Sequence, residues 1–291
     1  MTGQDRAEKK DGNKPLVSII IPVYNSASFI TGTLDSILDQ ELIKGGAYTE
    51  IIVVDDGSSD SSVSTVRNYV NQKNLEYKER KQKEAEAGEH LSYVNRSPAL
   101  IRILPNRHRK GAAGARNTGI DAAGGRYIAF IDSDDRWMKE KLSRQTAFMQ
   151  KTGAAFSFTG YEFADEDCEG CGKVVRVPER ISYSEALKNT TIFTSTVMFD
   201  MNRLKKADIY FPYVESEDTA NWWKVLKNKG DAFGLDENLT LYRRSANTLS
   251  SNKLTAVRRI WALYRRVEKL PLYYSLYCFM WYALRAVKRR V

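Results

Sequence analysis

Three carboxylates, Asp132, Asp134 and Asp135, follow the apolar run at residues 128–131. Carboxylates this close together repel one another and resist burial, so they need a positively charged partner. A strand that ends in Asp-Ser-Asp suits a hard divalent cation, which binds one or two carboxylates together with phosphate oxygens and water. The alternative is that these acids cap the following helix or face solvent, because acidic turns are common.

A second pair of acids, Glu217 and Asp218, stands near the start of a segment with helical spacing at residues 214–230. Carboxylates can act as general acids or bases. The alternative is simple helix stabilisation, because acids are favourable at a helix N-terminus. Residue types and spacing alone leave both roles open.

The elements that position these acids alternate along the first half of the chain. Four apolar runs are typical of buried strands, and a helical pattern follows each of the first three. The expected strands lie at residues 16–25, 50–60, 99–106 and 126–135, and the expected helices at 29–40, 58–70 and 111–125. This order predicts an α/β fold with a mainly parallel sheet and helices on both faces, whose ligands bind beyond the carboxyl ends of the strands.

The second half of the chain predicts a change of strand direction. Residues 154–163 and 172–179 look like the two strands of a hairpin, and residues 194–200 look like a further strand. The sheet should therefore become mixed in this half.

The composition is that of a globular protein, with 42% apolar and 28% charged residues over 291 positions. Three cysteines are too few for a disulfide framework and no apolar secretory segment follows Met1, so we expect a cytoplasmic location. Cys168 and Cys171 have the spacing of half a zinc site, but His90 and His108 lie far away in the sequence. We expect this pair to form an exposed turn.

The net charge of +9 is concentrated at the C-terminus, where residues 253–291 hold ten Lys and Arg residues and a single acid, Glu268. This basic and aromatic tail suits an anionic membrane surface better than a nucleic acid. Apolar and basic residues alternate between two sides of a helix over 257–269, and the uncharged run 272–284 is shorter than the ~20 residues of a spanning helix. The tail is expected either to lie on the inner face of the cell membrane, making the protein peripheral, or to pack against the rest of the chain.

Five motifs in order, PVYN, VVDDGS, GAAGARNTG, FIDSDD and ESED, give the chain its likeness to a known family. Together they resemble the family 2 glycosyltransferases, inverting enzymes of the GT-A fold that use a nucleotide-activated sugar. Among these, the chain resembles bacterial enzymes that assemble capsule, teichuronic acid or lipopolysaccharide. The resemblance covers residues 15 to about 242.

The resemblance implies a nucleotide site. Pro22 and Tyr24 would hold the nucleobase, Asp56 would accept a hydrogen bond from its ring NH with Asp55 as the second choice, and Arg116 would lie near the nucleotide. An aromatic ring offers a stacking face, and a carboxylate selects a ring NH such as that of uracil, which favours a uridine diphosphate sugar. The remaining members of the expected nucleotide site are Asn25, Asp132 and Ser133.

The resemblance also implies the reacting groups. Asp134 would hold Mn or Mg on the diphosphate, Asp132 would reach the ribose, and Asp218 would be the base that activates the acceptor hydroxyl, with Glu217 as its neighbour. One departure concerns a histidine that often follows a late Tyr-Arg pair in the family, because Ser245 occupies that position here.

The expected domain boundaries follow from these motifs. They are a leader at 1–14, a GT-A domain at 15–252, and a helical tail at 253–291. The domain divides into a nucleotide-binding half, 15–135, and an acceptor half, 136–252, and carries a charged surface insertion at 77–99.

The function implied is metal-dependent, inverting transfer of a sugar from a nucleotide diphosphate sugar to a hydroxyl of a glycan or lipid-linked acceptor. One alternative is a nucleotidyltransferase, but the segment after the first strand lacks the glycine-rich, basic phosphate loop expected of that class. The other is a non-catalytic carbohydrate-binding or nucleic-acid-binding module, which only the overall charge favours. No nucleic-acid partner is expected, and the sequence leaves open a homo-oligomer.

Overall fold

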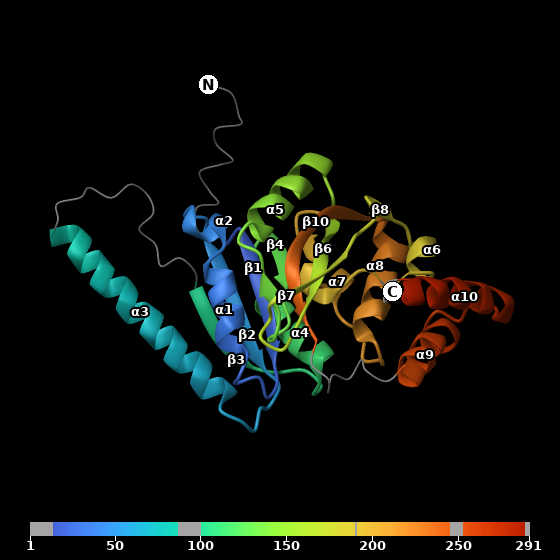
Figure 1. Cartoon of the computed structure of the whole chain (residues 1–291), viewed down its shortest axis with the longest axis horizontal. Coiled ribbons are helices and arrows are strands. Elements are labelled where there is room, and N and C mark those ends of the chain that lie inside the picture. The colour runs from blue at the N-terminus through green and yellow to red at the C-terminus, as the bar shows by residue number, and fades with distance from the viewer. Residues whose placement is uncertain (1–13, 87–99, 190, 245–252, 289–291) are drawn as a thin grey trace.

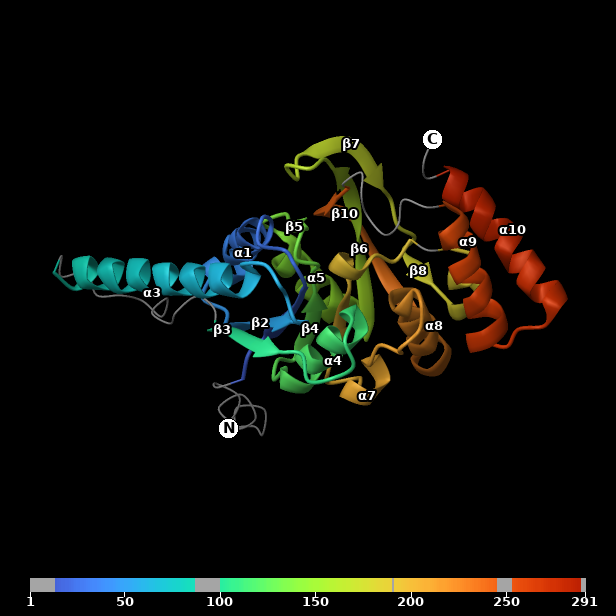
Figure 2. The ribbon, with the colours of Figure 1, turned by 90° about the horizontal axis from the view of Figure 1, so that it is seen from below.

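A mixed sheet of ten strands with helices on both faces forms the centre of the protein (Figures 1 and 2). The computed structural model describes residues 14–86, 100–189, 191–244 and 253–288. The strands are β1 (Val17–Val23), β2 (Thr49–Asp55), β3 (Leu100–Pro105), β4 (Tyr127–Phe130), β5 (Arg136–Trp137), β6 (Phe156–Ala164), β7 (Gly170–Val175), β8 (Arg180–Ile181), β9 (Met198–Asp200) and β10 (Ala232–Arg243).

The helices pack on both faces of the sheet and continue into the C-terminal tail. They are α1 (Ile30–Leu38), α2 (Glu41–Lys44), α3 (Ser62–Glu86), α4 (Ala112–Ala122), α5 (Lys141–Thr152), α6 (Tyr183–Ala186), α7 (Lys206–Ile209), α8 (Glu217–Lys229), α9 (Lys253–Ala262) and α10 (Leu272–Lys288). A 3₁₀ turn covers Thr194–Thr196, and a π-helical turn, Leu263–Val267, extends α9.

The first half of the sheet is parallel, in the order β3-β2-β1-β4. Alternate residues of the buried strand β1 enter two different cores, Ile20 on one face and Ile19 and Ile21 on the other. One core lies under α4, α8 and the tail, and the other lies under α1, α3 and α5. The predicted parallel sheet is confirmed, because strands apolar on both faces require a layer of helices on each side.

The second half of the sheet is mixed, as predicted. β6 pairs antiparallel with β7 in the expected hairpin, and β9 runs antiparallel to both β4 and β6. β10 pairs in parallel with β6 and antiparallel with β5 and β8. Strand β9 therefore joins the parallel half to the rest of the sheet.

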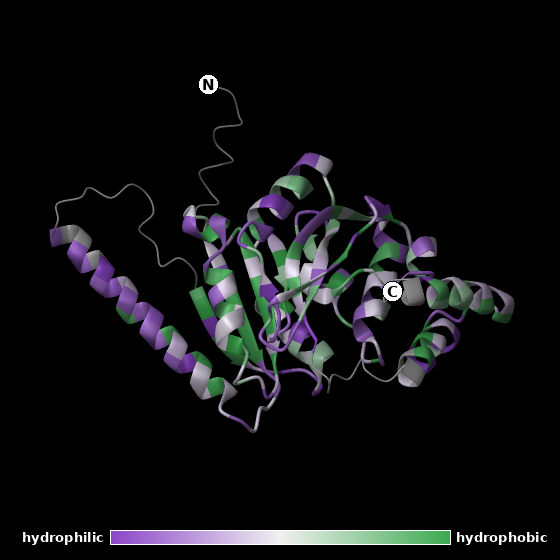
Figure 3. Ribbon diagram, viewed as in Figure 1, coloured by the Kyte–Doolittle hydropathy of each residue, from purple (hydrophilic) through white to green (hydrophobic). Residues whose placement is uncertain are grey.

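Helix α3 is longer than the sequence predicted, because it continues past Val70 to Glu86 and includes the first ten residues of the charged insertion. No Gly or Pro interrupts it, and hydrogen bonds such as Gln72 Nε2 to Glu76 Oε1 (2.9 Å) join residues four apart. Its far half is hydrophilic and extends from the body of the protein (Figure 3). The rest of the insertion, residues 87–99, lies outside the described residues.

The C-terminal tail packs on the domain through α9 and the inner side of α10. Ile260, Leu263, Tyr264 and Cys278 are buried in the same core as α8. The rings of Tyr264 and Trp223 stack with centroids 5.3 Å apart and planes at 6°, and the Tyr264 hydroxyl donates to the carbonyl of Leu187. Packing of the tail on the domain, one of the two alternatives that the sequence left open, is what the structure shows. No helix in the described part of the chain is long and apolar enough to cross a membrane.

Tyr264→Ala should destabilise the protein by about 3–5 kcal/mol, because it leaves a cavity against Trp223 and removes a buried hydrogen bond. Urea denaturation of the full chain measures the loss. The control is Tyr273→Ala on the same tail, where the side chain is 76% exposed and the change should stay within about 0.5 kcal/mol. Equal losses in the two variants would contradict the packing role of the tail.

Lys141, at the start of α5, is fully buried, and its amine has no hydrogen-bond partner among the described residues. Its Nζ lies 3.7 Å from the centroid of the Trp137 ring. Burial lowers the pKa of this lysine well below its ordinary value, because the charged amine loses its hydration.

Lys141→Met should therefore stabilise the fold near neutral pH by about 1–3 kcal/mol, since it keeps the apolar stem and removes the unpaired amine. In the wild type the unfolded chain binds a proton that the folded chain does not, so stability rises with pH up to the ordinary pKa of lysine. The variant should lack this slope. Urea denaturation near neutral pH and at about pH 9 measures both effects. The same free energy of unfolding and the same pH dependence in wild type and variant would contradict them.

Candidate active site

The carboxyl ends of β1, β2 and β4 meet at one edge of the sheet and bring the predicted motifs together. Val23 pairs with Asp55 in the β1–β2 register, and the Asp56 amide donates to the Val23 carbonyl (2.8 Å). β4 pairs with β1 on its other side, so Asp132 follows close to the end of β1. PVYN, VVDDGS and DSDD therefore lie together at the carboxyl ends of the parallel strands, where the sequence predicted that ligands bind.

The turn that carries Asp132 and Asp134 is held from below by Asp135. This side chain is fully buried and accepts hydrogen bonds from Ser195 Oγ (2.5 Å) and from the Arg243 amide (3.1 Å). Ser195 Oγ in turn accepts from the Asp132 amide (3.0 Å). Burial and the neighbouring Asp134 raise the pKa of Asp135 well above its ordinary value, so this acid is a structural support of the turn.

Asp134 lies above this support and is available to a ligand. Its carbonyl oxygen accepts from Arg243 Nε (2.7 Å), but its carboxylate forms no hydrogen bond with another side chain of the described residues. Burial and the nearby Asp132 carboxylate raise the pKa of Asp134 to about 6, because like charges oppose ionisation. A cation bound here would relieve that repulsion.

The residues present fit a divalent ion that takes most of its ligands from substrate. The described residues contain no cluster of three or more His, Cys, Asp or Glu side chains that could enclose a metal. Mg²⁺ in particular is usually held by one or two carboxylates with phosphate oxygens and waters, which matches a single free carboxylate at Asp134. Ser245, where the family often has histidine, lies outside the described residues.

Arg116 connects the two acidic motifs. Its Nη2 donates to Asp132 Oδ1 (2.7 Å), and its Nη1 donates to Glu217 Oε1 (2.9 Å). The guanidinium is buried and lies 5.2 Å from the Phe211 ring centroid. This arrangement places ESED beside DSDD, although 101 residues separate Arg116 from Glu217 along the chain.

Asp218 differs from its neighbour because no ion pair joins it to a cation among the described residues. Its Oδ1 accepts a hydrogen bond from the Thr219 amide (2.6 Å). Burial and the adjacent Glu217 raise the pKa of Asp218, which is a shift that favours proton acceptance. Ser216, just before the pair, has a left-handed backbone (φ 54°), which sharpens the turn into α8.

The predicted base-binding residues lie at the carboxyl ends of β1 and β2. The Tyr24 ring is 51% exposed, so one of its faces is free to stack, and Lys110 Nζ lies 5.2 Å from its centroid. Pro22 is half-buried beside it. Asp56 is mostly buried, and its two oxygens accept from Asn106 Nδ2 (2.6 Å) and the Gly111 amide (2.8 Å).

Three residues predicted to bind nucleotide hold loops in place. Asn25 Oδ1 accepts from the Ser59 amide (2.8 Å), and Asp55 accepts from the amides of Gly57 (3.2 Å) and Ser58 (3.1 Å). Ser133 Oγ is buried against Ser26 Oγ at 2.7 Å. Asp55 and Asp56 each accept two hydrogen bonds within the protein, so these contacts do not separate the two acids, and Asn25 and Ser133 hold the neighbouring loops in position.

The small residues of GAAGARNTG permit a close approach, as the sequence indicated. A Cβ on Gly114 would lie 1.8 Å from the Arg109 carbonyl oxygen, and one on Gly119 would lie 2.4 Å from an Ile20 methyl carbon. Helix α4 can therefore pack directly on β1, which brings Arg116 to Asp132 at the edge of the sheet.

Sequence reasoning missed four residues that shape the site, which are Thr33, Asn106, Ser195 and Arg243. Thr33 Oγ1 donates to the carbonyls of Ser133 (2.9 Å) and Asp135 (2.8 Å), and the other three hold Asp56, Asp132 or Asp134. The only signal was polarity at strand ends, as in the Thr194–Thr196 turn and after β3.

The expectation of an exposed Cys168–Cys171 turn is half wrong. Cys171 is exposed, but Cys168 is buried with its sulfur 4.0 Å from the carbonyl oxygens of Asp134 and Leu241. Burial raises the pKa of Cys168 to about 11. The β6–β7 turn therefore packs under the DSDD turn, which the local sequence could not show.

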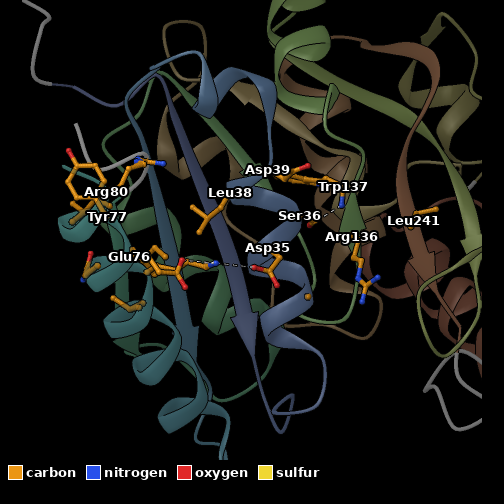
Figure 4. A pocket seen from close by; sticks show the side chains of 16 residues that line it. Asp35, Ser36, Leu38, Asp39, Glu76, Tyr77, Arg80, Arg136, Trp137 and Leu241 are labelled. Atoms are coloured by element: carbon orange, nitrogen blue, oxygen red, sulfur yellow. Dashed lines mark hydrogen bonds and ion pairs between the residues drawn. The ribbon is translucent and has the colours of Figure 1, made fainter. Parts of the chain in front are cut away.

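A cavity of about 890 Å³ lies elsewhere, between α1 and α3 (Figure 4). Charged side chains such as Asp35, Glu76 and Arg136 line it, together with Trp137. None of the predicted site residues lines this cavity, so it is separate from the site at the carboxyl ends of β1, β2 and β4.

Comparison with known proteins decides the family. A model described as "Glycosyl transferase family 2" matches residues 18–210. The chain is 37% identical over 279 residues to the "Putative teichuronic acid biosynthesis glycosyltransferase TuaG" of Bacillus subtilis, covering 96% of this chain and 98% of that protein. The chain belongs to glycosyl transferase family 2.

A second relative supports the family, and a solved structure supports the fold. The "UDP-Glc:alpha-D-GlcNAc-diphosphoundecaprenol beta-1,3-glucosyltransferase WfgD" of Escherichia coli is 35% identical, with 88% of each chain covered. The solved structure of the mannosyltransferase PcManGT from Pyrobaculum calidifontis, in complex with GDP-Man and Mn²⁺, is 18% identical, with a TM-score of 0.61 over 89% of this chain and 66% of that one. This family 2 glycosyltransferase therefore has the predicted GT-A fold, and the nucleotidyltransferase alternative is set aside.

Proposed function

We propose that this glycosyltransferase moves a sugar, with inversion, from a UDP-sugar to a hydroxyl of a lipid-linked glycan during assembly of a cell-surface polysaccharide. The observation that supports the proposal is the bridge through Arg116, which joins Asp132 to Glu217 and so brings the DSDD and ESED motifs side by side. In the proposal, the first motif serves the donor diphosphate and the second serves the acceptor alcohol.

The donor binds at the carboxyl ends of β1, β2 and β4. The free face of Tyr24 stacks the base, and Asp56 accepts from the ring NH with the lone pairs that Asn106 and Gly111 leave unused. Asp132 holds the ribose, and Asp134 holds Mn or Mg against the diphosphate. The bound ion supplies positive charge that stabilises the departing nucleoside diphosphate.

The acceptor half depends on Asp218. Its carboxylate takes the proton of the acceptor hydroxyl while the hydroxyl oxygen attacks the anomeric carbon from the face opposite the diphosphate. A single displacement of this kind inverts the anomeric configuration. Glu217 keeps Arg116 in place, and its negative charge adds to the effect of burial, which is the main cause of the raised pKa of Asp218.

The relatives support the substrate classes. WfgD, by its name, transfers glucose from UDP-glucose to a GlcNAc-diphosphoundecaprenol, and TuaG is named for teichuronic acid biosynthesis. We therefore infer a UDP-hexose donor, with UDP-glucose the first to test, and an acceptor whose sugar is attached to a lipid diphosphate.

The test is a donor screen with the full chain, Mn²⁺ or Mg²⁺, and a synthetic GlcNAc-diphosphate lipid. We expect UDP release with one UDP-hexose, an inverted product linkage, and loss of both on chelation of the metal. Turnover of GDP-sugars alone, or transfer with retention, would contradict the proposal.

A further inference from the structure

Helix α10 presents a continuous apolar face to solvent. The exposed residues of this outer face recur every three or four positions, so they cover one half of the helix circumference. They are Leu272, Tyr273, Leu276, Tyr277, Met280, Trp281 and Leu284. No charged residue lies between Leu272 and Leu284 in the sequence, and the opposite half of the helix, including Ser275 and Cys278, is buried on the domain.

An apolar surface of this kind requires a partner. Single exposed apolar residues such as Leu75 on α3 are normal, but a row along four turns of one helix usually marks an interaction site. α10 lies at the outer edge of the molecule, at the end opposite α3 (Figures 1 and 2). Its outer face is therefore accessible to a large flat partner.

Cations border the outer face. Arg265, Arg266 and Lys269 are exposed just before α10 begins. Along the first half of α10, Lys188 Nζ lies 5.8 Å from the Tyr277 ring centroid, and farther along the helix the Arg285 guanidinium lies 5.8 Å from the Trp281 ring centroid.

The tail itself offers no exposed acidic side chain in its described part, although the exposed Glu185 of α6 interacts electrostatically with Lys188 and Arg285. Its single acid, Glu268, has a mostly buried side chain that accepts hydrogen bonds from Tyr183 and from Lys227 (2.5 and 2.9 Å). Its carboxylate is therefore used within the domain.

We propose that the outer face of α10 lies in the surface layer of an anionic lipid bilayer, with the helix parallel to the membrane. Tyr and Trp side chains favour the boundary between headgroups and acyl chains, and the flanking cations match anionic headgroups. A second copy of this chain is a poorer occupant, because it would bring two basic tails together.

The structure also shows which of two tail segments can make the contact. The sequence left both the amphipathic segment 257–269 and the run 272–284 as candidates for the membrane interface, but the apolar residues Ile260 and Tyr264 of the first segment are buried in the domain. α10 is the helix with a free apolar face. Membrane binding is inferred from the exposed face of α10 alone. Only its role, which is to bring the enzyme to a lipid-linked acceptor, depends on the proposed function.

The test uses the full chain, because a chain truncated before α9 would lose the core contacts of Tyr264. Binding to phosphatidylcholine vesicles with and without phosphatidylglycerol is measured by co-sedimentation. We expect binding only with phosphatidylglycerol, and weakening by salt. The double variant Leu276→Gln, Met280→Gln changes two residues that are 55% and 51% exposed, and it should bind at least about tenfold more weakly.

The matched control is Leu75→Gln, which is 59% exposed on α3 and should bind like the wild type. Equal vesicle binding by wild type and double variant, or no binding by either, would overturn the proposal. So would a dimer of the wild type in solution that the double variant abolishes without any vesicle binding. Donor hydrolysis without lipid should be unchanged in the double variant, so an inactive chain that still binds vesicles would contradict the proposed function alone.

Discussion

Asp218→Asn is expected to lower sugar transfer about 10³-fold while UDP binding stays within a few-fold of wild type. Amide nitrogen cannot take the acceptor proton, and loss of a positioned base costs about 10²–10⁴ in rate. The shape is conserved, and Asp218 is not part of the Arg116 ion pairs that reach Asp132 on the donor side. Steady-state turnover and isothermal titration with UDP measure the two effects separately.

Glu215→Gln is the matched control for this variant, because Glu215 is exposed and only three positions away. It should keep wild-type turnover. Glu217→Gln tests the neighbour, since it breaks one ion pair of Arg116 and should affect both turnover and nucleotide binding. Wild-type turnover in the Asp218→Asn variant would refute the assignment of Asp218 as the base.

Asp134→Asn is expected to remove the effect of the metal. Neutral amide oxygen is a poor ligand for a hard cation, so the enzyme should lose charge stabilisation at the leaving group and transfer should fall on the order of 10²-fold or more. Titration of UDP in the presence and absence of Mn²⁺ measures how much the metal strengthens UDP binding. The wild type should bind UDP more tightly with Mn²⁺, and the variant should show no difference.

Asp39→Asn is the control, because Asp39 is an exposed acid directly after α1 that pairs with Lys44 and lines the separate cavity. It should leave turnover and the Mn²⁺ effect unchanged. Mn²⁺-dependent UDP binding that survives in Asp134→Asn would place the ion elsewhere.

The strands and the edge where the motifs meet could be predicted from the sequence because both depend on local patterns. Uninterrupted apolar runs in β1, β2 and β4 require burial on both faces, and parallel strands place their carboxyl ends together. The contacts between motifs could not be predicted. Ser195 reaches Asp132 and Asp135 across about sixty residues, and its local sequence carries no sign of that distant contact.

For the tail, the sequence likewise predicted the helix but not its contacts. Its pattern identified an amphipathic basic helix, but amphipathicity does not say what covers the apolar side. The structure buries that side of α9 against Trp223 and leaves the outer face of α10 free. Local sequence likewise could not fix the end of α3, since hydrophilic residues such as Gln72 and Glu76 suit a solvated helix as well as a loop.

The most direct test of the account is a crystal structure of the full chain with UDP and Mn²⁺. We predict the ion on the carboxylate of Asp134, the diphosphate against it, and the uracil stacked on Tyr24 with its ring NH toward Asp56. UDP and Mn²⁺ bound away from these residues, for example in the cavity between α1 and α3, would contradict the account.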